Sequence, residues 1–175
     1  AGRVAPVRTY QDLLSNPGDE ALFDHYFTSQ LTLVPLNGRA RTIGAPAVYL
    51  DVAVSPDGKY ILNEIAKRPY SYAVPDDLFP TQIVVTDMTG RVVKTVADLP
   101  LRDDVPTAFD AVAPGPRSVG WRADAPATLT WVEALDGGDI RRAAEFRDRV
   151  FMQAAPFTGE PVKLIDLKER FGGVQ

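Results

Sequence analysis

The chain has 175 residues, 45% of them apolar and 24% charged, with a net charge of −4 and a pI of about 5.0. The length suits one domain, and the acidic balance without a basic patch argues against a nucleic-acid partner. Cysteine is absent, which excludes disulfides, thiol catalysis and cysteine metal sites, and no apolar run approaches the ~18 residues of a membrane-crossing helix.

The first part of the chain predicts two short helical turns. Residues 9–14 could form one, with Thr9 as its N-cap, and Asn16-Pro17-Gly18 should end it. A second short helix could begin at Asp19, whose carboxylate would cap it. The N-terminus lacks a positively charged segment followed by an apolar stretch, so no signal peptide is expected here.

His25 is the only histidine of the chain. A catalytic base needs a nucleophile and an orienting group beside it, and the neighbouring sequence offers neither. We therefore expect a partly buried histidine packed beside Phe23 and Tyr26. Runs 31–36 and 40–43, on either side of Asn37-Gly38, predict a hairpin.

The central stretch predicts a meander of four strands. Its apolar runs are rich in Val, Ile, Leu and Tyr and have strand length: 48–54, 60–65, 81–87 and 92–96. Ser55-Pro56-Asp57-Gly58 joins the first two as a tight turn, because proline sets φ and glycine accepts a positive φ. Gly90 can take the left-handed position between the last two.

A long loop separates the second and third of these strands and holds the candidate binding residues Arg68, Tyr70 and Tyr72. Long loops on a rigid sheet often bind ligands. Arg68 could pair with a substrate carboxylate while the two tyrosines form an apolar wall. In the alternative, Arg68 pairs with a local aspartate such as Asp76, and the tyrosines cover the sheet.

The unit repeats further along the chain. Runs 118–121, 128–134, 149–154 and 162–167 predict four more strands, and the turn at Gly159 resembles the turn at Gly90. Trp121 and Trp131 are expected to pack between sheets rather than to stack on a ligand.

Three local motifs carry no chemistry in this reading. The segment 115–120 fails the nucleophile-elbow pattern, because Pro116 stands where glycine is needed and no helix follows. Asp136-Gly137-Gly138-Asp139 is expected to be a turn rather than a phosphate loop. Asp103, Asp104 and Asp110 lack the further ligands of a calcium loop, so a solvated surface is expected and no metal site is predicted.

The pattern predicts an all-β fold, a partial β-propeller of about two and a half four-stranded antiparallel blades. Its parts would be a lead-in and half blade (1–47), a blade (48–100), a second blade (115–168) and an approach to another (169–175). Such a fragment leaves sheet edges open, which could allow copies to associate.

Two strings in particular resemble the N-terminal propeller of glutamyl endopeptidases, in the prolyl oligopeptidase family of serine peptidases from bacteria and plant chloroplasts. They are Arg68-Pro69-Tyr70-Ser71-Tyr72 and Trp131-Val132-Glu133-Ala134-Leu135-Asp136-Gly137-Gly138-Asp139. Segments 10–14, 23–26, 55–62, 97–100, 115–117, 121–124 and 155–157 resemble it too.

The resemblance implies a propeller that covers an α/β-hydrolase domain of the same polypeptide, which holds the catalytic Ser, Asp and His. None of those motifs occurs here, so no catalytic residue is predicted and no cofactor is implied. The implied parent cleaves peptides after glutamate in the periplasm or outside a bacterial cell. This chain would gate or position the peptide substrate, with Arg68 as the first candidate to meet a substrate carboxylate.

Two other classes of function compete with this one. A free-standing β-rich module could bind proteins through its loops. A complete small enzyme is disfavoured by the absence of cysteine, the single histidine and the missing nucleophile elbow.

Overall fold

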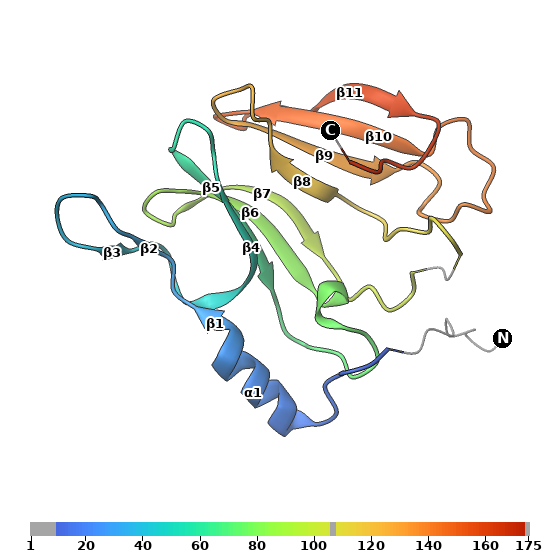
Figure 1. Cartoon of the computed structure of the whole chain (residues 1–175). Helices are drawn as coiled ribbons and strands as arrows, with labels where there is room; N and C mark the ends of the chain where they lie inside the picture. Colours follow the sequence, from blue (N-terminus) through green and yellow to red (C-terminus); the bar gives the residue numbers. More distant parts are fainter. Residues whose placement is uncertain (1–9, 106–107, 174–175) are drawn as a thin grey trace.

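The computed structural model describes residues 10–105 and 108–173, and these form an all-β fold with one α-helix and three antiparallel sheets (Figure 1). The predicted fold class is confirmed. The elements are α1 (Pro17–Phe27), β1 (Thr28–Ser29), β2 (Thr32–Leu33), β3 (Arg41–Thr42), β4 (Ala47–Val54), β5 (Tyr60–Ala66), the 3₁₀ turn η1 (Asp76–Leu78), β6 (Thr81–Asp87), β7 (Val92–Leu99), β8 (Arg117–Trp121), β9 (Thr128–Ala134), β10 (Asp148–Ala154) and β11 (Val162–Leu167).

The first large sheet has the order β1-β4-β5-β6-β7, so its last four strands form the predicted meander. The turn between β4 and β5 has the expected chemistry. The Ser55 amide donates to the Tyr60 carbonyl at 2.9 Å, the Ser55 hydroxyl bonds the Asp57 carboxylate at 2.7 Å, and Gly58 has φ of 71°. The turn sequence thus fixes the register of this hairpin.

The second large sheet is also a meander of consecutive strands, β8-β9-β10-β11. Its strands begin and end within one residue of the predicted runs. Gly159 has φ of 82° between β10 and β11, and Gly90 has φ of 89° between β6 and β7, so the two similar turns share a left-handed glycine.

The two large sheets pack face to face and enclose the main core, and in Figure 1 the β8–β11 sheet lies above the β4–β7 strands. Val85 and Leu129 are fully buried there, and Trp131 is buried beside them. Fully burying one such aliphatic side chain contributes about 1.5–3 kcal/mol. Trp121 is half-buried in the same layer, so both tryptophans pack between the sheets as expected.

Strands β4 and β8, the first of each meander, are joined directly. The Trp121 indole N–H donates to the Ala53 carbonyl at 3.0 Å. The turns that follow the two strands are joined as well, because the Asp57 amide donates to the Pro126 carbonyl at 2.9 Å. Two consecutive four-stranded meanders joined at their first strands are consistent with the predicted partial propeller.

The N-terminal helix differs from the two short turns predicted. Residues 10–14 of the described chain are not helical, and Thr9 lies outside the described residues. The helix has 11 residues and begins at Pro17, because the Asn16 side chain caps the amides of Gly18 and Asp19. Proline suits this first position, where its missing N–H costs nothing.

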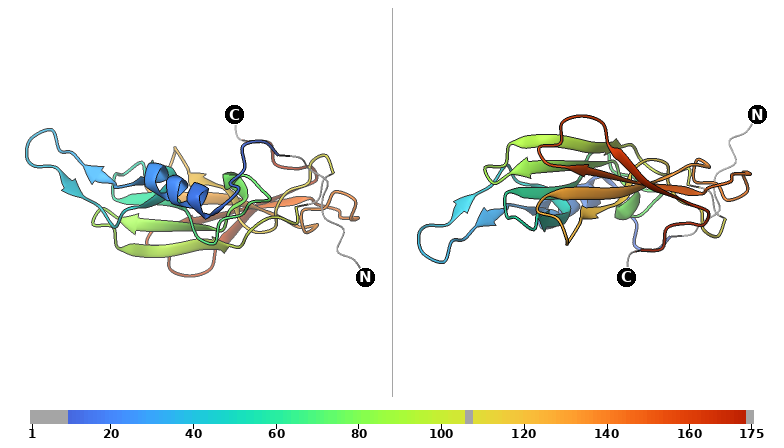
Figure 2. Two further views of the ribbon diagram at one scale, coloured as in Figure 1. Left: turned by 90° about the horizontal axis from the view of Figure 1, so that it is seen from below. Right: turned by 90° about the horizontal axis from the view of Figure 1, so that it is seen from above.

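The predicted hairpin of residues 31–43 forms only a short ribbon. Strands β2 and β3 pair over two residues each, and β1 pairs with β4 instead. The ribbon projects beyond one end of the molecule (Figure 2). Its base contacts the β6–β7 turn at Gly44 and Gly90, where a Cβ on Gly90 would lie 2.2 Å from the Gly44 nitrogen.

Candidate functional site

The three predicted binding residues lie together where the loop after β5 meets helix α1. Arg68, Tyr70 and Tyr72 all contact carboxylates of that helix, Glu20 and Asp24. These two acids stand one helical turn apart and so present their carboxylates on one side of α1. Five polar side chains from two distant segments therefore form one cluster.

The geometry of the cluster centres on Arg68. Its Nε and Nη2 donate to Asp24 Oδ2 at 3.2 and 2.5 Å, and its Nη1 donates to Glu20 Oε2. The Tyr70 hydroxyl donates to Asp24 Oδ1 at 2.5 Å, and the Tyr72 hydroxyl donates to Glu20 Oε1 at 2.8 Å. The guanidinium carbon also lies 4.7 Å from the centroid of the Tyr70 ring, within cation–π range.

These contacts shift the ionisation of the cluster. Hydrogen bonds from Tyr72 and Arg68 lower the pKa of Glu20, and those from Tyr70 and Arg68 lower the pKa of Asp24. Burial, and then the bond to Asp24, raises the pKa of the Tyr70 hydroxyl. Both carboxylates are thus charged at neutral pH, and one cation faces two anions.

The cluster has one more carboxylate than cations, and this affects whether Arg68 can bind a substrate carboxylate as expected. A substrate carboxylate would have to replace Glu20 or Asp24 at the guanidinium. The predicted alternative named a local aspartate such as Asp76 as the partner of Arg68, but the structure pairs it with two acids more than 40 residues earlier. Its contact with substrate stays a prediction.

An aromatic cluster lies beneath the polar one and fixes α1 to the loop. The ring of Phe23 meets the ring of Tyr70 edge-on at 4.9 Å, and Tyr70 stacks on Phe79 at 5.1 Å. All three rings are buried. Tyr70 therefore packs its ring in the core, and its hydroxyl binds a carboxylate, a contact that the sequence did not predict.

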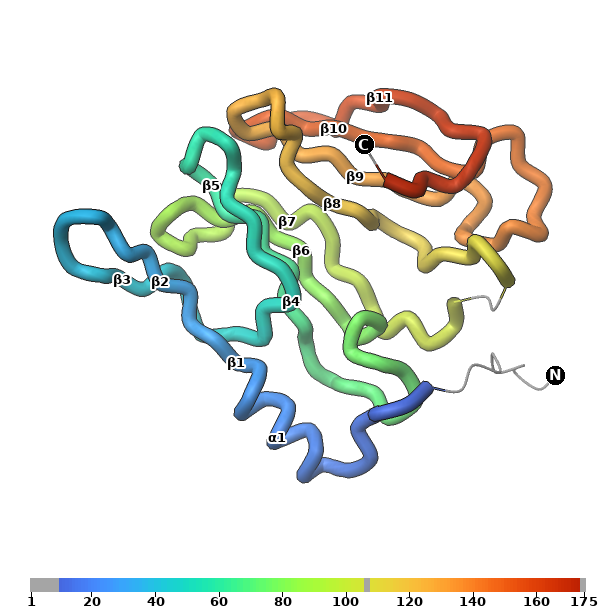
Figure 3. Tube along the Cα trace, viewed as in Figure 1, coloured from blue at the N-terminus to red at the C-terminus, as the bar shows by residue number. Residues whose placement is uncertain are grey.

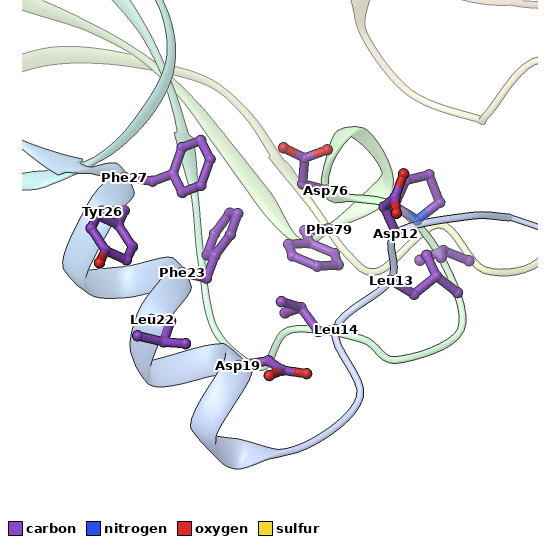
Figure 4. Close-up of a pocket in the computed structure, with 12 residues that line it drawn as sticks. Asp12, Leu13, Leu14, Asp19, Leu22, Phe23, Tyr26, Phe27, Asp76 and Phe79 are labelled. Atoms are coloured by element: carbon purple, nitrogen blue, oxygen red, sulfur yellow. The ribbon is translucent and has the colours of Figure 1, made fainter.

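A hollow of about 440 Å³ opens beside the buried rings, between α1, residues 12–14 and the loop that ends at η1 (Figure 4). Its walls are mainly apolar and include these side chains: Leu13, Leu14, Leu22, Phe23, Phe27 and Phe79. Three carboxylates also line it, from Asp12, Asp19 and Asp76. Among the residues that the structure describes, no basic side chain lines this hollow.

A second polar cluster lies in the β8–β11 sheet. Asp136 and Asp148 are fully buried there, and they bind Arg117, Arg147 and Arg170. Arg170 holds both acids at once, with 2.6 and 2.7 Å bonds to Asp136 and a 3.0 Å bond to Asp148. Burial favours a neutral Asp136, yet the bonds from Arg170 and Arg147 outweigh burial and lower its pKa.

This second cluster also binds the segment that follows β11 to the sheet. Phe171 donates its amide to Asp148 Oδ2 at 2.6 Å, so the segment after β11 turns back beside the strands (Figure 3). Asp136 does lie in the predicted turn, where Gly137 and Gly138 have φ of 69° and 83°. Its ion pairs were missed, because nothing near it in the sequence indicates partners 11 and 34 residues away.

Groups for catalysis are sparse in the described residues. His25 is exposed on α1 with its ring edge-on to Tyr26 at 5.0 Å, so its predicted partial burial is wrong. No group of three or more His, Asp or Glu in the described part of the chain could hold a metal ion. No helix within residues 10–105 and 108–173 is long and apolar enough to span a membrane.

Sequence reasoning also missed Glu20 and Asp24. Their four-residue spacing is ordinary on a helix surface, and their partners lie 44 to 52 residues later. Only the observation that the same loop carries a cation and two phenols could have suggested an acidic counterpart.

Comparison with known proteins gives two close relatives. The chain is 46% identical over 173 residues to the probable glutamyl endopeptidase, chloroplastic, of Arabidopsis thaliana, and 45% identical over 172 residues to the protein of the same name from Oryza sativa subsp. japonica. The matches cover 98% and 97% of this chain but only 18% of each relative. No family model matches the chain, and no solved structure matches it significantly.

Proposed function

We propose that this chain, which is homologous over nearly its whole length to a stretch of the glutamyl endopeptidases, is a non-catalytic region of a larger serine peptidase. The observation that carries the proposal is the match itself. It spans 98% of this chain at 46% identity and only 18% of the relative's length. In such an enzyme the catalytic work belongs to another part of the polypeptide.

The finer proposal is that these residues supply blades of a β-propeller in an enzyme of the prolyl oligopeptidase family. Two consecutive four-stranded meanders packed face to face support it. So does the bond from Trp121 to Ala53, which joins the first strands of the two sheets. The blades would gate or position peptide substrates for an α/β-hydrolase domain of the same polypeptide.

The first test separates a catalytic from a non-catalytic chain. The 175-residue protein is incubated with a fluorogenic peptide that contains one glutamate at the reporter bond. We expect no hydrolysis above the blank, whereas the full-length parent should cleave the peptide. Turnover by the 175-residue protein that survives purification to homogeneity would overturn the proposal.

The second test addresses gating in the full-length parent. The same cleavage sequence is offered as a short peptide and within a loop of a folded protein, and the ratio of the two kcat/KM values is measured. Trp121→Ala removes the bond and the ring that join the two sheets, so it should raise relative cleavage of the folded substrate. Trp131→Phe, a milder change in the same core layer, is the control, and an unchanged ratio in both variants argues against gating.

The role of Arg68 has its own test. If a substrate carboxylate displaces Glu20 or Asp24 from Arg68, Arg68→Ala in the parent should raise KM for glutamate peptides and leave kcat nearly unchanged. Arg91→Ala is a matched control, because Arg91 pairs with Asp87 on an exposed turn. An unchanged KM in Arg68→Ala would leave this arginine as a residue that only holds α1.

Association of copies through open edges also stays a proposal. Strand β11 ends its sheet and leaves Val162, Leu164 and Ile165 about half exposed. Such an edge can pair with another strand. Sedimentation of the 175-residue protein should then show a concentration-dependent dimer, and a monomer at high concentration would count against it.

A further inference from the structure

Helix α1 leaves an unusually apolar surface uncovered. Only Phe23 is buried among its residues, whereas Leu22, Tyr26 and Phe27 are 54%, 74% and 56% exposed. All three line the hollow beside the helix (Figure 4). Single exposed apolar residues are common, but three around one hollow mark a surface that contacts something else.

The remaining polar side chains that line the hollow within residues 10–105 and 108–173 are acidic. Asp12 and Asp76 lie across the hollow from α1 (Figure 4), and the described residues give neither carboxylate a hydrogen bond or ion pair. Asp19 differs, because its carboxylate accepts from the Ser15 amide at 2.8 Å and from Asn16 Nδ2 at 3.1 Å. The nearby cation Arg68 is already bound to two acids of α1.

We propose that this hollow binds a peptide segment of another protein that carries an arginine or lysine next to a large apolar side chain. The apolar side chain would lie against Phe27 and Leu22, and the cation would reach Asp12 and Asp76. A volume of about 440 Å³ suffices for two or three side chains and falls in the usual range of ligand sites. Charge complementarity selects the basic partner and disfavours acidic peptides and nucleic acids.

The proposal does not depend on the peptidase activity of a parent enzyme. The proposed ligand carries a positive charge, whereas the substrate implied for the parent enzyme carries a negatively charged glutamate. The bound segment would also lie at α1 rather than at a catalytic centre. Failure of the proposed function would therefore leave it standing, and its own failure would leave the proposed function untouched.

The test is a titration of the isotope-labelled 175-residue protein, followed by NMR. The probes are acetyl-Leu-Arg-Phe-amide and acetyl-Leu-Glu-Phe-amide, which differ in one side chain. With the arginine probe we expect saturable shifts centred on Leu22, Tyr26 and Phe27, with binding at least fivefold tighter than for the glutamate probe. Raising the salt from 0.05 to 0.5 M should reduce that preference, because exposed charges are screened.

Variants connect the preference to individual carboxylates. Asp12→Asn and Asp76→Asn should each weaken binding of the arginine probe about two- to fivefold, as expected for a solvent-exposed ion pair, with little effect on the glutamate probe. Asp77→Asn is the matched control, since Asp77 neighbours Asp76 and is exposed but does not line the hollow. Tyr26→Ser should weaken both probes alike.

Four outcomes would overturn the proposal. Equal binding of both probes, or equal losses in Asp76→Asn and Asp77→Asn, would show that the carboxylates select nothing. Shifts confined to other parts of the protein would place the peptide elsewhere. Shifts of the α1 residues that follow protein concentration without a probe would identify a second copy of the chain as the occupant.

Discussion

Asp148→Ala should be among the most damaging single substitutions in this chain. The side chain is fully buried and accepts from three donors: an Arg117 guanidinium, Arg170 Nη1 at 3.0 Å and the Phe171 amide at 2.6 Å. Its loss removes the carboxylate partner of Arg117 and leaves Asp136 as the remaining acid for Arg147 and Arg170. One of these arginines already has a buried nitrogen, Arg117 Nη1, without a partner among the described residues.

The size of the effect follows from the burial of the cluster. Removing one member of a buried ion pair costs about 3–5 kcal/mol, because the remaining charge stays uncompensated. A domain has only about 5–15 kcal/mol of stability in total. With a urea slope of about 2 kcal/mol/M, a loss of 4 kcal/mol lowers the midpoint of unfolding by about 2 M.

The assay is urea unfolding followed by tryptophan fluorescence, since Trp121 and Trp131 both pack between the sheets. Asp124→Ala is the control, because Asp124 is 69% exposed and pairs only with Arg122, so its midpoint should shift by less than about 0.5 M. Asp148→Asn keeps the shape of the side chain and gives a measurable transition if the alanine variant does not fold. Equal midpoints for Asp148→Asn and Asp124→Ala would refute the reasoning.

Three further predictions concern stability. Gly90→Ala should cost about 2–4 kcal/mol more than Gly58→Ala in urea unfolding, because both glycines have positive φ but only the new Cβ at Gly90 would strike backbone. Trp121→Phe should cost about 1–3 kcal/mol by the same assay, because it leaves the Ala53 carbonyl without its donor. The carboxyl groups of Asp139 and Asp166 have pKa values lowered to about 2 by their arginine partners, so their stabilisation is complete above about pH 5 and is lost as the pH falls toward 2. A urea midpoint unchanged between pH 5 and pH 2 would contradict that last expectation.

The strands could be predicted from the sequence because their signals are local. β6, β9 and β11 have the bounds that their apolar runs indicated, and Ser55-Pro56-Asp57-Gly58 forms the turn that its residues favour. Alternation of side chains and turn residues is decided over a few positions, without the rest of the chain.

The start and length of helix α1 were predicted wrongly, and the reason is also local. Pro17 and Gly18 normally end a helix, but proline is equally at home at the first helical position when the preceding residue caps the amides. Asn16 does so here. With Asn16 as the N-cap, the same residues predict a helix that begins at Pro17.

The polar clusters could be predicted only in part. Arg68, Tyr70 and Tyr72 do lie together, because they share one loop, but Glu20 and Asp24 reach them only through the packing of Phe23 on the loop. Tertiary packing determines which residues pair with a buried charge, and these partners cannot be identified from a single sequence.

The position of Arg170 has a consequence for synthesis on the ribosome. The β4–β7 meander is complete once Leu99 has emerged, whereas the buried acids Asp136 and Asp148 gain a principal counter-ion only when Arg170 follows about 70 residues later. At bacterial or eukaryotic elongation rates this interval lasts about 4–14 s. Until the second sheet is complete and packs on it, the nascent first sheet displays the apolar face that Leu129 and Trp131 later cover, so we expect chaperones that hold hydrophobic surfaces to bind it.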